Sequence, residues 1–206
     1  MIARQFALAA LCGAVFFGGA CKRQPALEVI QLGSPLPRLQ KYWTIPEFTL
    51  TGLDGKPVDR SYLAGKVWVA DFFFTSCPGP CERLTNRLAS VHRAVADDDR
   101  VRLVSITADP EADTPEVLRQ YSARFQAGDR WLFLTGEKPA IHALARDGFK
   151  LPIASDPNAA GLITHSTRLV LIDRTGTVRG FYEGAGDDDA PAKELLADLR
   201  ELLNER

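Results

Sequence analysis

The fold is decided by residues 67–81, which read VWVADFFFTSCPGPC. The first eight of these residues are almost all apolar, which is typical of a central strand covered on both faces of a sheet. A helix is predicted from about Pro80 to Ala96, because apolar residues recur there at three- and four-residue steps. Cys77 and Cys81 therefore lie where a strand passes into a helix. Thiols at a helix start are expected to be acidic, because the peptide dipoles and free N–H groups favour the thiolate.

The rest of the pattern alternates strands and helices. Further strands are expected over residues 48–51, 101–107, 131–134, 168–172 and 178–182, and further helices over 113–125, 138–147 and 191–203. An Asp-Gly turn at residues 54–55 predicts a small N-terminal hairpin. This order of elements predicts an α/β fold of the thioredoxin kind, with a central sheet flanked by helices.

Length and charge limit the possible functions. The 206 residues are enough for one ordinary domain and a leader. The formal net charge is −1 and no block of Lys and Arg stands out. We therefore expect no nucleic-acid partner, since such binding depends on neutralising phosphates.

The first 21 residues are predicted to be a leader. Residues 6–20 are uncharged and mostly apolar, too short for a comfortable membrane span but suited to a secretory signal. Residues 18–21, GGAC, resemble a bacterial lipoprotein cleavage box in which Cys21 becomes lipidated. An uncleaved anchor helix and ordinary cleavage with a free Cys21 are the alternatives, and each of the three exports the domain.

Residues 22–46 contain four prolines and no clear period, which predicts a tether between the membrane and a domain over residues 47–206. Cys12 falls in the leader, so Cys77 and Cys81 are the two thiols left to the domain if Cys21 is lipidated. One thiol pair is not a disulfide framework, and a bridge closing so short a loop adds little stability. The pair is expected to bind a soft metal ion or to exchange disulfides.

Two thiolates leave a metal under-coordinated, so a third ligand is expected among the three histidines. His92 lies eleven residues after Cys81 on the same predicted helix, about 16 Å along its axis and too far away. His142 lies in mid-helix between apolar neighbours. His165 is the candidate, because the loop before the strand at 168–172 passes beside the cysteine turn in a thioredoxin-like sheet. Two thiolates and an imidazole suit Cu(I) and can hold Cu(II), and zinc also accepts them.

Three motifs together resemble the Sco/SenC family: FTSCPGPC at 74–81, TADPEADTP at 107–115 and HST at 165–167, the last ahead of LIDRTG at 171–176. The resemblance covers about residue 45 to the end. The chain departs from the family pattern at Glu82, where proline is usual, and at Ser76, where histidine is frequent. Neither departure removes a ligand. We expect the segment around Asp109 to form a turn and helix cap, and Asp187-Asp188-Asp189 to form a solvated turn.

The resemblance implies a membrane-tethered copper protein with a thioredoxin fold, whose ligands by position are Cys77, Cys81 and His165. It implies copper delivery to the dinuclear copper site of cytochrome c oxidase, or maintenance of that site's thiols. The partners expected are the oxidase subunit that holds this site or another copper carrier, and the membrane through the N-terminal anchor or lipid. The location expected is the periplasmic side of the cytoplasmic membrane.

Whether the chain is an enzyme is left open by the sequence. The alternative to a copper chaperone without turnover is a thiol–disulfide oxidoreductase, in which Cys77 and Cys81 form the redox pair acting on exported thiols. The three-residue spacing and the lack of a proline near His165 weigh against an ordinary thioredoxin mechanism. A redox or copper sensor is a third hypothesis.

Overall fold

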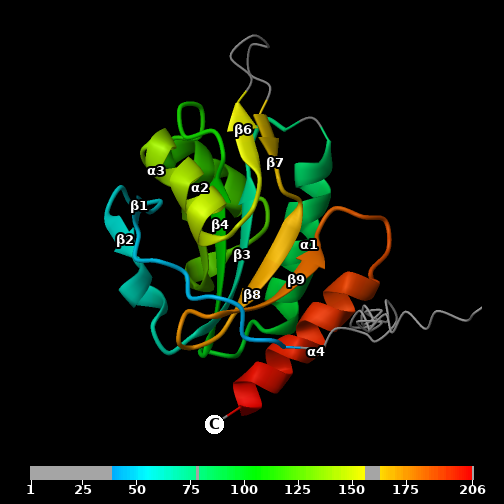
Figure 1. The fold of residues 1–206 in the computed structure, drawn as a ribbon. Helices are drawn as coiled ribbons and strands as arrows, with labels where there is room; N and C mark the ends of the chain where they lie inside the picture. The colour runs from blue at the N-terminus through cyan, green and yellow to red at the C-terminus, as the bar shows by residue number, and fades with distance from the viewer. Residues whose placement is uncertain (1–38, 78, 156–162, 206) are drawn as a thin grey trace, which may run out of the picture. The chain divides into compact units, whose positions relative to one another are not determined.

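The computed structural model describes residues 39–77, 79–155 and 163–205. The predicted leader, residues 1–21, and most of the predicted tether lie outside these ranges. The elements in chain order (Figure 1) are β1 Thr49–Thr51, β2 Pro57–Asp59, η1 Arg60–Leu63, β3 Val67–Phe73, α1 Pro80–Ala94, β4 Val101–Thr107, α2 Pro115–Ala123, η2 Gly128–Arg130, β5 Trp131–Leu134, α3 Lys138–Ala143, η3 Leu144–Gly148, β6 Ile153–Ser155, β7 Ile163–His165, β8 Arg168–Ile172, β9 Val178–Glu183 and α4 Ala190–Asn204.

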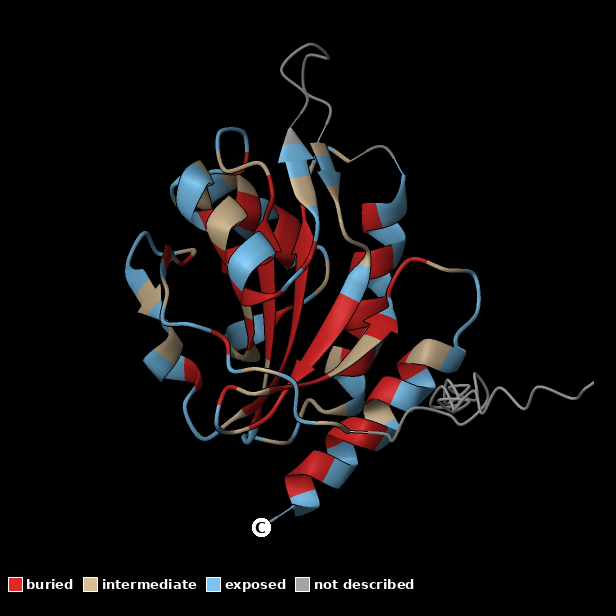
Figure 2. Ribbon diagram, viewed as in Figure 1, coloured by how far each residue is buried: buried red, intermediate tan, exposed pale blue. Residues whose placement is uncertain are grey.

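The core of the fold is a five-stranded sheet with the order β5-β4-β3-β8-β9. Strands β3, β4 and β5 are parallel, and β8 runs antiparallel to β3 and to β9. Every residue of β3 is buried, as its apolar sequence predicts for a strand covered on both faces (Figure 2). Strands β1 and β2 form the predicted N-terminal hairpin. The predicted α/β fold with a thioredoxin-like central sheet is therefore confirmed.

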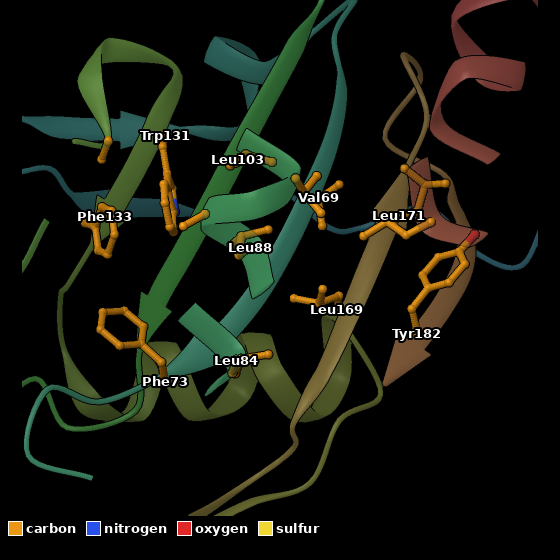
Figure 3. Packing of buried hydrophobic residues seen from close by; sticks show 14 of the residues in the cluster. Val69, Phe73, Leu84, Leu88, Leu103, Trp131, Phe133, Leu169, Leu171 and Tyr182 are labelled. Carbon is orange, nitrogen blue, oxygen red and sulfur yellow. The ribbon is translucent and has the colours of Figure 1, made fainter. Parts of the chain in front are cut away.

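Two apolar clusters cover the two faces of the sheet. One cluster joins α1 and α4 to the sheet, and Leu84 and Leu88 of α1 point at β3, β4 and β8 (Figure 3). The other joins α3 and residues near the N-terminal hairpin to the opposite face. Cys81 belongs to the first cluster and is 1 % exposed. The first turn of α1 is therefore held by the core rather than by exposed contacts.

Several elements differ from the sequence prediction. Strands β6 and β7 form a separate antiparallel hairpin, whereas the segment directly before residue 168 is predicted to be a loop. The third helix ends at Ala143 and continues as a π-helical turn, η3, which places the Gly148 carbonyl 2.6 Å from the indole nitrogen of Trp43. The second helix ends at Ala123, two residues early. No helix within the described ranges is both long and apolar enough to cross a membrane.

Residues 39–46 pack against the sheet, although the sequence suggested that the tether extends to residue 46. The amide of Ile45 donates to the carbonyl of Gly176, and the amide of Val178 donates to the carbonyl of Trp43. Ile45 is fully buried. Because backbone pairing and apolar burial both begin before residue 47, the folded body includes this segment.

One carboxyl group, that of Asp71, lies inside the core. Asp71 of β3 is 1 % exposed, and its Oδ1 accepts a 2.6 Å hydrogen bond from the Ser105 hydroxyl. Its Oδ2 has no hydrogen-bond partner among the described residues. Burial therefore raises the pKa of Asp71 to about 7.

Replacing Ile45 by Ala should lower the free energy of unfolding by about 2–5 kcal/mol, because the change leaves a cavity against the sheet. Urea denaturation measures the effect. Tyr62, whose exposure is 53 %, supplies the control, and Tyr62→Ala should change stability by no more than about 0.5 kcal/mol. Equal effects of the two substitutions would show that residues 39–46 do not belong to the folded body.

Asp71 should make stability fall as the pH rises. The folded carboxyl keeps its proton to about pH 7, whereas an unperturbed Asp releases it near pH 3.8. The contribution is thus fully present below about pH 4 and is lost as the pH passes through 7. Asp71→Asn removes this dependence, which we expect to reach at most about 4 kcal/mol.

Urea denaturation at pH 4.5 and pH 8 of wild type and Asp71→Asn tests this expectation. Asp129→Asn, at an exposed carboxyl, is the matched control and should keep the wild-type dependence. The assignment fails if Asp71→Asn and wild type lose the same stability between the two pH values.

Candidate metal centre

The two cysteines occupy different local structures. Strand β3 ends at Phe73 and α1 begins at Pro80, where proline is tolerated because it lies at the first helical position. Cys81 lies in the first turn of α1 and is buried. Cys77 precedes the helix in the turn, with its amide donating to the Phe74 carbonyl at 3.4 Å, and it is half-buried. The helix start predicted near Pro80 is therefore confirmed, so Cys81 lies inside the helix and Cys77 lies in the turn before it.

His165 reaches the thiols from β7 rather than from a loop. It pairs with Ile153 in the register of the β6–β7 hairpin, which stands beside the start of α1 (Figure 1). Ile163 and Thr164, which precede His165, are β-branched and were a weak signal for this strand. The ring of His165 also packs edge-to-face on Phe74, with 5.5 Å between centroids. A strand and an aromatic contact therefore fix the direction of the ring.

The hydrogen bonds of His165 determine which nitrogen faces the sulfur. Nδ1 lies 2.9 Å from the Ser166 carbonyl, which can only accept, so Nδ1 is the donor. Nε2 lies 2.9 Å from Cys81 Sγ. Burial lowers the pKa of His165, although hydrogen bonds to the backbone at Ser166 and Phe72 act in the opposite direction. The neutral ring thus presents the lone pair of Nε2 to the thiols, as a metal ligand requires.

The side chains of Cys77, Cys81 and His165 form the only group of three or more potential metal-binding residues found in the described ranges. Their ligand atoms all lie within 4.8 Å of one another. Two ligand atoms that each lie about 2.0–2.3 Å from one ion are separated by at most about 4.6 Å. Small side-chain movements would therefore let all three atoms bind a single ion.

Burial is the main influence on the pKa of Cys81. Its pKa is raised, chiefly because the thiol is removed from water and also through its contact with Cys77. A hydrogen bond from the Phe74 backbone acts in the opposite direction. The expectation of an acidic thiol at the helix start is therefore wrong for Cys81. A metal ion that binds here must displace the proton of this thiol.

The other histidines lie apart from this group. His92 packs on Trp131 with 5.6 Å between ring centroids, and burial and the nearby Arg130 and Arg93 lower its pKa. His142 lies on α3. Neither belongs to the group of candidate ligands, as their positions in the sequence predict.

The acidic segments also behave largely as the sequence suggested. The turn at residues 187–189 is exposed and meets the arginines of α1, with 3.9 Å between Arg83 and Asp187. Glu82 is exposed and lies 3.8 Å from Arg124. Neither segment joins the thiols.

Asp113 is the residue near the site whose role sequence analysis missed. The helix cap is Thr114, whose hydroxyl accepts from the Val117 amide. Asp113 is fully buried and accepts hydrogen bonds from Thr75, on the turn that carries Cys77. Two cap-type residues in succession, only one of which can cap, were the signal that could have revealed it.

Comparison with known proteins agrees with this geometry. The family model described as SCO1/SenC matches residues 37–204. The SCO1 protein homolog of Bacillus subtilis is 30% identical over 161 residues, which are 77% of this chain and 82% of that protein. The crystal structure of a SCO1/SenC family lipoprotein from Bacillus anthracis superposes with a TM-score of 0.74 at 31% identity, covering 82% of this chain and 100% of that one.

A solved structure with metal is also similar. Bradyrhizobium japonicum ScoI with copper bound superposes with a TM-score of 0.66 at 26% identity, covering 78% of this chain and 99% of that one. The family model spans most of the chain, including the β3–α1 turn and the β6–β7 hairpin. The chain belongs to the SCO1/SenC family.

Proposed function

We propose that this chain binds one copper ion through Cys77, Cys81 and His165 and delivers it to the copper site of a cytochrome c oxidase. The observation that carries the proposal is the convergence of two sulfurs and one imidazole nitrogen within 4.8 Å. This donor set suits Cu(I) and can also hold Cu(II). The copper-bound structure of the Bradyrhizobium relative supports copper over zinc.

The exposure of the ligands suits transfer rather than storage. Cys77 and His165 are half-buried whereas Cys81 is buried. An incoming thiol can therefore replace His165 or Cys77 while Cys81 still holds the ion. A site with three protein ligands leaves a position open for that exchange, which a closed four-ligand site would not.

The recipient we propose is the oxidase subunit that carries the dinuclear copper site, or another copper carrier. BsSco, another protein of similar structure, is a member of the Sco family of cytochrome c oxidase assembly proteins. We further propose that residues 1–21 export and anchor the chain and that the tether holds the domain on the periplasmic side of the membrane. The lipoprotein relative from Bacillus anthracis supports this arrangement.

A thiol–disulfide oxidoreductase is the second candidate. Cys77 and Cys81 are both free thiols and lie close enough to form a bridge with modest movement. The accessible Cys77 would attack a partner disulfide and Cys81 would resolve the mixed disulfide. Maintenance of the oxidase thiols would use the same pair.

Anaerobic titration of Cu(I) into the reduced protein, with Cys12 and Cys21 replaced by Ser, tests the proposal. We expect one ion per chain. His165→Ala should weaken binding at least tenfold, because one of three ligands is lost, and Cys81→Ser should weaken it further. His142→Ala is the matched control and should bind as wild type does.

Equal affinity of the His165→Ala and His142→Ala proteins would contradict the proposed site. Rapid reduction of insulin disulfides by a protein that retains no copper would instead favour the oxidoreductase.

A further inference from the structure

A buried carboxylate ties the turn that carries Cys77 to a distant part of the chain. Asp113 lies in the loop between β4 and α2 and is fully buried. Its Oδ2 accepts from the Thr75 amide at 3.1 Å, and its Oδ1 accepts from the Thr75 hydroxyl at 2.5 Å. Both oxygens thus hold a single residue, which lies two positions before Cys77.

The carboxylate is itself anchored on the side away from the thiols. The Thr107 hydroxyl, at the end of β4, donates to Oδ2 at 2.5 Å. The Asp113 amide donates to the Asp109 carbonyl at 2.9 Å. Since β4 is a central strand of the sheet, the turn is fixed relative to the sheet through this side chain.

Phe74, the residue before Thr75, contacts all three candidate ligand residues. The backbone of Phe74 makes a hydrogen bond to the Cys81 thiol, and its carbonyl accepts from the Cys77 amide. The ring of Phe74 packs against the ring of His165. A shift of Thr75 would therefore move the residue that contacts the Cys81 thiol, the backbone of Cys77 and the imidazole.

We infer that Asp113 is a positioning residue, which holds the three-ligand site in its binding geometry through its two hydrogen bonds to Thr75. Asp113 does not itself touch the ion. The expected loss of affinity for copper rests on the proposed function, whereas the expected change in the accessibility of the Cys77 thiol does not. A turn released from Asp113 should expose Cys77 and separate the ligand atoms.

The test compares two substitutions that each remove one hydroxyl from the same carboxylate. Thr75→Val removes the hydroxyl hydrogen bond on the site side and keeps the one from the Thr75 amide, and Thr107→Val removes the hydroxyl hydrogen bond on the sheet side. In Thr107→Val the two hydrogen bonds from Thr75 remain, while the Asp109 amide also loses its acceptor. Thr107→Val should therefore destabilise the fold at least as much as Thr75→Val, which separates positioning from general stability.

Two readouts are taken in the background with Cys12 and Cys21 replaced by Ser. The first is the rate at which iodoacetamide modifies Cys77 in the reduced protein, followed by peptide mass spectrometry. The second is the affinity for Cu(I) in competition with a chromophoric chelator. Thr75→Val should raise the alkylation rate at least threefold and weaken Cu(I) binding at least tenfold.

Thr75→Ser, which restores the hydroxyl, should return both readouts to within about twofold of wild type, and Thr107→Val should stay within the same range. Equal changes in Thr75→Val and Thr107→Val, or no change in Thr75→Val, would overturn the inference. If the unsubstituted protein binds no Cu(I), the proposed function fails, and the alkylation rates alone then decide whether Asp113 positions the turn.

Discussion

The site depends on the contact between Cys81 and His165, which joins positions 84 residues apart in the chain at 2.9 Å. Sheet order makes this contact possible. Strand β8 runs antiparallel beside β3, so the chain enters β8 at the end of the sheet where β3 runs into the cysteine turn. Because β7 directly precedes β8, the imidazole arrives at that same end. Any fold with this strand order would bring the two segments together, and the β6–β7 hairpin sets the final approach.

Burial determines the chemistry of this contact. It raises the pKa of the Cys81 thiol and lowers that of His165, so both groups favour their neutral forms. A bound cation replaces the thiol proton, and the charge of the thiolate is then compensated inside the core. Cys77, which remains accessible at the surface, supplies the second sulfur where a partner can reach it. Cys81 thus suits holding the ion, and Cys77 suits exchanging it with a partner.

Two buried carboxyl groups near the site differ in how their polarity is satisfied. Asp113 uses both oxygens, and the hydrogen bonds that it accepts join the cysteine turn to β4. Asp71 is also buried, with one oxygen unpaired among the described residues, and burial raises its pKa. A satisfied buried acceptor stabilises and orients its surroundings, whereas an unsatisfied one lowers stability when it ionises. The same residue type therefore orders the turn in one place and reduces stability in the other.

The sequence by itself determined the elements of the sheet, the N-terminal hairpin and the identity of the converging side chains, because apolar periodicity and the spacing of the thiols are local properties. The convergence of His165 could be expected from strand order once the thioredoxin-like arrangement was recognised. Tertiary structure alone decided the strand character of β7 and the bridge from Asp113 to Thr75. It also reversed the expected acidity of Cys81. These features depend on which groups are removed from water and on which distant atoms meet, and neither is encoded in the residues beside them.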